Sequence, residues 1–152
     1  MLDLVDLRGP EIVDERRAAS LLGLRIQFMR LPDHLMAIPS RARISSFIGA
    51  KDGTAYVSVQ QDPAEMRFAI AREIGRWTMH RERLDAPGYD GVSVRSGHPK
   101  SAEQREAEIF ASHLLAPEYR IRHWRSEGSR GSASLGRILG VPATVIQDRI
   151  AA

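Results

Sequence analysis

The residues best suited to chemistry are five consecutive ones in mid-chain, Arg72-Glu73-Ile74-Gly75-Arg76. Positions i and i+4 of a helix lie one turn apart on one face. In the motif His-Glu-x-x-His, two histidines with this spacing hold a zinc ion and the glutamate deprotonates the metal-bound water. Here both outer positions are arginine, whose guanidinium has five donors, no acceptor lone pair and a pKa above about 12. The spacing is that of a zinc site, but only the glutamate, the general-base position, remains.

The composition predicts one ordinary domain that spans residues 1–152. The chain has 43% hydrophobic residues and no cysteine, so it can bury a core but has neither a disulfide framework nor a thiolate metal site. No run approaches the roughly 18 apolar residues of a membrane span, and residues 1–6 lack a basic leader region. We expect a cytoplasmic protein with no membrane partner.

The net charge of +3 is small, and all but two of the 22 basic residues are arginine. This balance is a mild indication of an acidic partner, nucleic acid included. A solvated, arginine-rich surface is the preferred explanation. Charge alone therefore excludes neither a protein nor a nucleic-acid partner.

The first part of the chain reads as a helix followed by strands. Residues 11–22 have helical periodicity and end before Gly23, a typical left-handed cap. The runs 24–28, 43–48 and 55–59 read as strands. They predict a small antiparallel or mixed sheet of about three strands.

The helix that carries the arginine motif has the clearest local signal. Asp62 is suited to the N-cap, Pro63 to the first helical position, and Glu65 completes a capping-box arrangement. We expect this helix to run to about residue 82, so the motif lies in its middle.

The rest of the chain predicts a loop and then helices. Residues 84–100 are rich in glycine and proline and form a loop, with a short strand an open alternative at 91–95. A helix follows over 101–115, and a C-terminal helical segment at about 118–150 contains a turn at Gly140.

Two blocks of sequence together carry a family resemblance. The run from Phe68 to Trp77 resembles F-x-x-A-H-E-L-G-H-W, and the run from Glu103 to Pro117 resembles E-x-x-x-E-A-N-x-F-A-x-x-L-L-M-P. Both patterns are those of the ImmA/IrrE family of metallopeptidases, and the resemblance covers roughly residues 12–150. It implies an α+β fold, a minimal zincin-like domain in which a small three-stranded sheet packs with the central motif helix and a helical C-terminal half.

The resemblance also assigns site positions. The family's zinc ligands are the two histidines and a glutamate of the second block. Arg72 and Arg76 stand at the histidine positions and Glu73 at the general base. We assign the third ligand position to Glu106, with Glu103 as the second choice. Because both histidines are replaced, we expect no zinc and no other cofactor.

The altered motif predicts a metal-replacing salt-bridge cluster of Arg72, Arg76, Glu73 and Glu106. Two guanidinium groups carry the same charge as one zinc ion, and without them the carboxylates would be buried and uncompensated. The alternative is that both arginines extend into solvent as part of a charged helix face.

A displaced metal site is conceivable from Glu73, His80, Glu106 and His113. Glu73 and His80 are two helical turns apart, about 10 Å of rise, which is too far to share one ion in a regular helix. His80 remains a candidate binding residue beside the motif, and a surface or packing role is the simpler reading.

The C-terminal run from Ser134 to Ile150 also resembles a helix-turn-helix. Its last helix offers Thr144, Gln147 and Arg149 as possible DNA contacts. Family members of the peptidase type end in a similar segment, so packing is the preferred interpretation and DNA contact the alternative.

The leading hypothesis is a catalytically inactive, pseudoenzyme member of this family that acts as a protein-binding regulatory module. By resemblance, relatives act on helix-turn-helix repressors in phage and other mobile elements, in stress responses or in toxin–antitoxin pairs, so such a transcription regulator is the expected partner. The alternatives are an active metalloendopeptidase with a non-standard metal site and a DNA-binding regulator.

Overall fold

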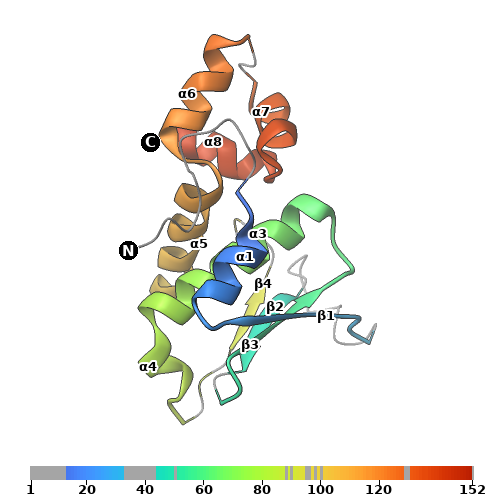
Figure 1. The fold of residues 1–152 in the computed structure, drawn as a ribbon, viewed down its shortest axis with the longest axis vertical. Coiled ribbons are helices and arrows are strands. Elements are labelled where there is room, and N and C mark those ends of the chain that lie inside the picture. The colour runs from blue at the N-terminus through green and yellow to red at the C-terminus, as the bar shows by residue number, and fades with distance from the viewer. Residues whose placement is uncertain are drawn as a thin grey trace.

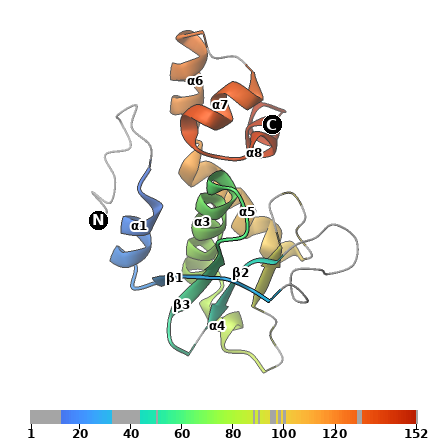
Figure 2. The same ribbon diagram turned by 90° about the vertical axis from the view of Figure 1, so that its right-hand side faces the viewer.

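The computed structural model places the sheet at one end and the C-terminal helices at the other, with two long helices between them (Figures 1 and 2). It describes residues 13–32, 44–49, 51–87, 89, 91–94, 97, 99, 101–128 and 131–151. The first 12 residues, the start of the strand predicted at 43 and parts of the predicted loop at 84–100 lie outside this description. No helix in the described ranges is long and apolar enough to span a membrane.

The sheet is mixed and has four strands in the order β1-β3-β2-β4. The strands are β1 (Arg25–Met29), β2 (Ile44–Gly49), β3 (Thr54–Ser58) and β4 (Val92–Val94). β1 pairs with β3 in parallel, and the other two pairings are antiparallel. Three of the strands were predicted. The fourth, β4, was only an alternative within the loop, because three residues carry too little alternation to identify a strand without its partner.

The described part of the chain also has seven helices, and the predicted α+β class is confirmed. They are α1 (Glu15–Leu21), α3 (Pro63–Met79), α4 (Arg81–Leu84), α5 (Ala102–Leu115), α6 (Glu118–Ser126), α7 (Ser132–Leu139) and α8 (Ala143–Ala151).

Helix α3 carries the motif and begins as its sequence predicts. The Asp62 side chain accepts a hydrogen bond of 3.0 Å from the Glu65 amide, and Pro63 is the first helical residue. The helix ends at Met79, slightly earlier than expected, where His80 leaves helical geometry. The motif residues Arg72 and Arg76 lie in the middle of α3, and their spacing of four residues places them on one face.

Helices α3 and α5 approach each other closely at Gly75. A Cβ atom at this position would lie 2.9 Å from the ring of Phe110 on α5. The absence of a side chain therefore lets α5 lie directly against the motif. This contact brings the acidic residues of α5 within reach of Arg72 and Arg76.

Two apolar clusters hold α3 in place. Towards the sheet, Ile70 and Ile74 pack with Ile48 of β2 and with Ala55 and Val57 of β3. All five are buried, so this face of α3 is fixed against the strands.

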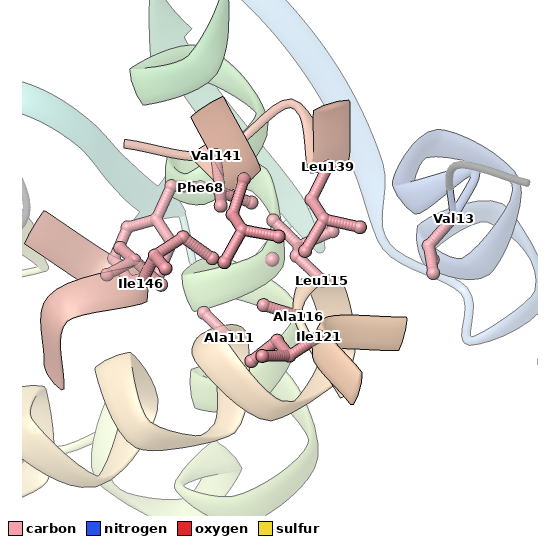
Figure 3. Packing of buried hydrophobic residues seen from close by; sticks show 12 residues of the cluster. Val13, Phe68, Ala111, Leu115, Ala116, Ile121, Leu139, Val141 and Ile146 are labelled. Atoms are coloured by element: carbon pink, nitrogen blue, oxygen red, sulfur yellow. The ribbon is translucent and has the colours of Figure 1, made fainter. Parts of the chain in front are cut away.

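The second cluster joins α3 and α5 to the C-terminal helices. Figure 3 shows Phe68 of α3 beside Val141 and Ile146, with Leu115 of α5 and Leu139 of α7 completing the group. The C-terminal helices are thus part of the same packed structure as the motif helix.

Arg67 connects three parts of the chain from its place on α3. Its guanidinium lies 3.1 Å from Glu15 and donates to the carbonyl oxygens of Val13, Leu139 and Gly140 at 2.7–2.9 Å. The hydrogen bonds and the ion pair of Arg67 therefore connect α3 with the start of α1 and with the α7–α8 turn.

Candidate functional site

Arg76 is fully buried, and both of its terminal nitrogens donate hydrogen bonds, whereas its Nε has none. Nη1 donates to Glu73 Oε2 at 3.1 Å, to the Gly91 carbonyl at 2.7 Å and to Ser93 Oγ at 2.9 Å. Nη2 donates to the hydroxyl of Tyr89. The side chain thus points into the protein, towards β4, and not into solvent.

Tyr89 extends this network to α5. Its hydroxyl accepts from Arg76 and donates to Glu103 Oε1. Nε of Arg76 also lies 3.8 Å from Glu103 Oε1. One carboxylate of α5 is therefore tied to the motif both directly and through a tyrosine.

Arg72, one turn earlier, is 1% exposed and lies between the sheet and α5. Its Nη2 donates to Ser46 Oγ on β2 at 3.3 Å, and its Nη1 lies 3.6 Å from Glu108 Oε1. Ser46 Oγ in turn donates to Glu73 Oε1 at 2.5 Å. A single buried serine therefore connects both halves of the cluster.

The two arginines differ in electrostatic environment. Burial lowers the pKa of Arg72, which the nearby Glu73 and Glu108 counteract only in part. Burial also acts to lower the pKa of Arg76, but the charge of Glu73, the Tyr89 hydrogen bond and Glu103 outweigh it and raise that pKa. Both groups stay protonated near neutral pH because an arginine titrates so far above it.

The cluster has a different membership from the predicted one. Glu106 was assigned to it, but its side chain is 59% exposed and lies 3.2 Å from Nε2 of His80. Glu103 and Glu108 supply the acids of α5 instead. The predicted place of Glu106 in the cluster is therefore wrong, for a geometric reason: Ala107 and Ala111 mark the buried stripe of α5, and Glu106 lies beside His80 at the end of α3. Its assignment to the third ligand position stays a prediction.

The residues at the family's ligand positions do not fit a zinc ion. Arg72 and Arg76 offer no lone pair, and every oxygen of Glu73 already faces a donor. Within the described ranges, no three His, Asp or Glu side chains are gathered where they could hold a metal. His80 pairs with Glu106, and His113 lies beside Arg149, so the four residues of the conceivable displaced site are not brought together.

Sequence reasoning missed four members of the network: Ser46, Ser93, Tyr89 and Glu108 as an ion-pair partner. Ser46 and Ser93 are buried polar residues in strands. A serine at an inward position of a strand is a weak signal of a buried partner. Tyr89 carried no usable signal, because it lies within the predicted loop at 84–100, where no periodicity indicates its partners.

A hollow of about 380 Å³ borders the cluster on the outer side of Glu108. Apolar side chains from three helices contribute to its surface, among them Phe68, Ile109 and Val145. Ile109 is 52% exposed, unusually open for an isoleucine. Polar groups at the same hollow are Arg105, Glu108, Ser112, Thr144 and Asp148.

The three possible DNA contacts do not share one free face. Thr144 lines the hollow beside α5, and Gln147 lies 3.5 Å from Ser132 on α7. Arg149 turns back to α5, where Nε donates to the Ala116 carbonyl at 3.2 Å. The helix–turn–helix itself is present, with Gly140 in the left-handed region at φ 67°.

A family comparison covers both the motif helix and α5. The sequence profile of the IrrE N-terminal-like domain matches residues 21–151, nearly the whole chain. The chain belongs to this family. It is a metallopeptidase-type domain, and the predicted resemblance is confirmed at this level. No curated protein matches the chain significantly.

Proposed function

We propose that this IrrE-like domain has lost zinc-dependent hydrolysis and serves as a protein-binding regulatory module. The observation that carries the proposal is the pair of buried guanidinium groups at the two histidine positions. Arg72 and Arg76 are each engaged by carboxylates and serines of the surrounding elements. A guanidinium cannot ligate zinc, so the reaction has no metal to activate its water.

The cluster also explains why the scaffold persists without the reaction. Glu73 has no exposed surface, and burying an unpaired carboxylate would cost several kcal/mol. The arginines supply the positive charge and the hydrogen-bond donors that this carboxylate requires. The scaffold therefore keeps its geometry while the chemistry is lost.

The hollow beside Glu108 is the surface that we assign to a partner. Its exposed Ile109 suits an apolar side chain of a protein segment, and its charged groups suit the polar atoms around that side chain. By resemblance to the family, the partner is a helix-turn-helix repressor or another regulator of a phage, stress or toxin–antitoxin system.

The test uses the purified full chain and a purified candidate helix-turn-helix repressor, chosen from the genes that neighbour its own. We expect saturable binding by calorimetry, with the repressor intact after incubation with zinc or with a chelator. Ile109→Glu places a charge in the hollow and should weaken binding at least about tenfold, as loss of a central apolar contact does. Leu21→Glu is the matched control, because Leu21 is 57% exposed on α1 and lies outside the hollow.

Two results of this experiment would overturn the proposal. One is cleavage of the repressor that zinc supports and a chelator stops. The other is binding that Ile109→Glu and Leu21→Glu weaken equally. Zinc content of protein purified without added metal, measured by mass spectrometry, gives an independent check, and one equivalent of bound zinc would contradict it.

A further inference from the structure

A second hollow, of about 440 Å³, lies between α6 and α8, and three of its six lining residues are arginines. The residues that line it are Glu118, Ile121, Arg122, Arg125, Arg149 and Ile150. The four from α6 stand at positions i, i+3, i+4 and i+7, so they form one continuous face of that helix. None of the six belongs to the buried arginine cluster or to the hollow beside Glu108.

Arg149 is held in position before any ligand arrives. Nε donates to the Ala116 carbonyl at 3.2 Å, and Nη1 lies 3.2 Å from Nε2 of His113. Its Nη2 has no hydrogen bond within the residues that the structure describes. A guanidinium fixed in this way loses little conformational freedom when it binds an anion.

The charges of the hollow are not balanced by the protein. Arg122 is paired with Glu118 across one turn of α6. Arg125 has no ion pair in the described part of the chain. Three guanidinium groups against one carboxylate leave two positive charges around the hollow. A ligand with two or more negative charges would neutralise them.

We infer that this hollow binds a small organic phosphate of nucleotide size. Guanidinium groups pair with phosphate oxygens through two parallel hydrogen bonds, which favours phosphate over a single carboxylate. The volume lies within the usual range for small-molecule sites, and Ile121 and Ile150 provide apolar contact for the organic part.

The arrangement favours a free phosphate ester over a nucleic-acid backbone. A duplex is usually contacted by basic residues spread along its backbone. Here the arginines converge on one hollow, and the exposed side of α8 carries the acidic Asp148. A nucleic-acid backbone is therefore the alternative that the experiment must distinguish.

The experiment is calorimetric titration of the full chain with ATP, with sodium pyrophosphate and with a 20-base-pair duplex DNA, at 150 mM salt. We expect saturable binding of ATP and pyrophosphate, and much weaker binding of the duplex. Arg125→Gln should weaken ATP binding at least tenfold. Arg137→Gln, an exposed arginine on α7 and the matched control for charge, should leave it unchanged.

Each other outcome overturns the inference. If neither ATP nor pyrophosphate binds saturably, the hollow is not a phosphate-binding site. If Arg125→Gln and Arg137→Gln weaken ATP binding equally, the binding arises from the general positive charge of the protein and not from this hollow. Duplex binding that is tighter than ATP binding and is lost in Arg125→Gln would make the hollow a nucleic-acid surface. Circular dichroism of each variant establishes that it is folded.

Discussion

Arg76 and Glu73 form an ion pair of 3.1 Å between two side chains with no exposed surface, three residues apart in α3. The desolvation of two buried charges opposes much of their attraction, so such a pair contributes little net stability by itself. Removing one partner is different, because the other charge is then left buried without compensation. Glu73 depends on more than this ion pair, because its carboxylate accepts hydrogen bonds from both Arg76 and Ser46.

Replacing Glu73 by glutamine is therefore expected to destabilise the protein strongly. The substitution keeps the shape but removes the charge that offsets Arg72 and Arg76. We expect the free energy of unfolding to fall by about 3–5 kcal/mol. Urea denaturation followed by circular dichroism measures this change.

The control for this substitution is Glu118→Gln, in the exposed ion pair with Arg122. Solvent screens that pair, so the free energy of unfolding should remain nearly unchanged. If both substitutions lower the free energy of unfolding equally, the charge of Glu73 in the buried cluster is no more important for stability than that of an exposed ion pair.

The local signals of α3 were sufficient to predict the helix and its motif. Asp62 and Pro63 determine the helix start, and the spacing of Arg72 and Arg76 then places both on one face. These features depend on residues within a few positions of each other. Sequence reasoning is most reliable where the physical cause is this local.

The acidic partners of the arginines could not be chosen in the same way. Glu103, Glu106 and Glu108 all lie on α5, and which of them meets the motif depends on how α5 crosses α3. That crossing is set by the contact of Gly75 with Phe110, two residues 35 positions apart. The family pattern predicted Glu106, whereas the packing of α5 on α3 places Glu103 and Glu108 beside the arginines.

Restoring the histidines offers a direct test of the corrected site. We expect Arg72→His with Arg76→His to create a zinc site in which Glu103 is the third ligand, because Glu103 is the carboxylate of α5 nearest Arg76. Zinc affinity is measured by competition with a chromogenic chelator.

Third-ligand variants in this double-histidine background separate the two assignments. Glu103→Gln should weaken zinc binding by about tenfold or more, since even the loss of an outer-shell partner costs about 10–100-fold. Glu106→Gln should have little effect, because Glu106 is directed to His80. The reverse order of effects would reinstate Glu106 as the ligand.

Arg67 is expected to control how firmly the two ends of the described chain are held. Arg67→Met retains the aliphatic stem but removes the donors to Val13, Leu139 and Gly140. Hydrogen bonds from a charged donor contribute about 1.5–3 kcal/mol each, but their losses are not additive. We expect a total loss of about 2–4 kcal/mol in the free energy of unfolding.

Hydrogen exchange locates the effect of Arg67→Met. Amides of α1 and of the α7–α8 turn should exchange faster, while those of the sheet change less. Arg17→Met is the matched control, because Arg17 is exposed on α1. Faster exchange spread evenly over the whole protein would show that Arg67 stabilises the fold only globally.

His113 is expected to make the folding stability of the protein depend on pH. Burial, and then the charge of Arg149, lower the pKa of His113 below its ordinary value of 6.5. Between these two pKa values the unfolded chain binds more protons than the folded one, so stability rises with pH there. This contribution is complete above pH 6.5 and is lost as the pH falls through the folded pKa.

The measurement is the melting temperature between pH 7.5 and pH 5.0. His113→Gln keeps an acceptor for Arg149 but cannot titrate, so its melting temperature should fall less on acidification than that of the unmodified protein. His123→Gln, at an exposed histidine of α6, should retain the full decline. If His113→Gln and the unmodified protein decline in parallel, the acid sensitivity arises from other groups and the contact of His113 with Arg149 does not depend on a neutral imidazole.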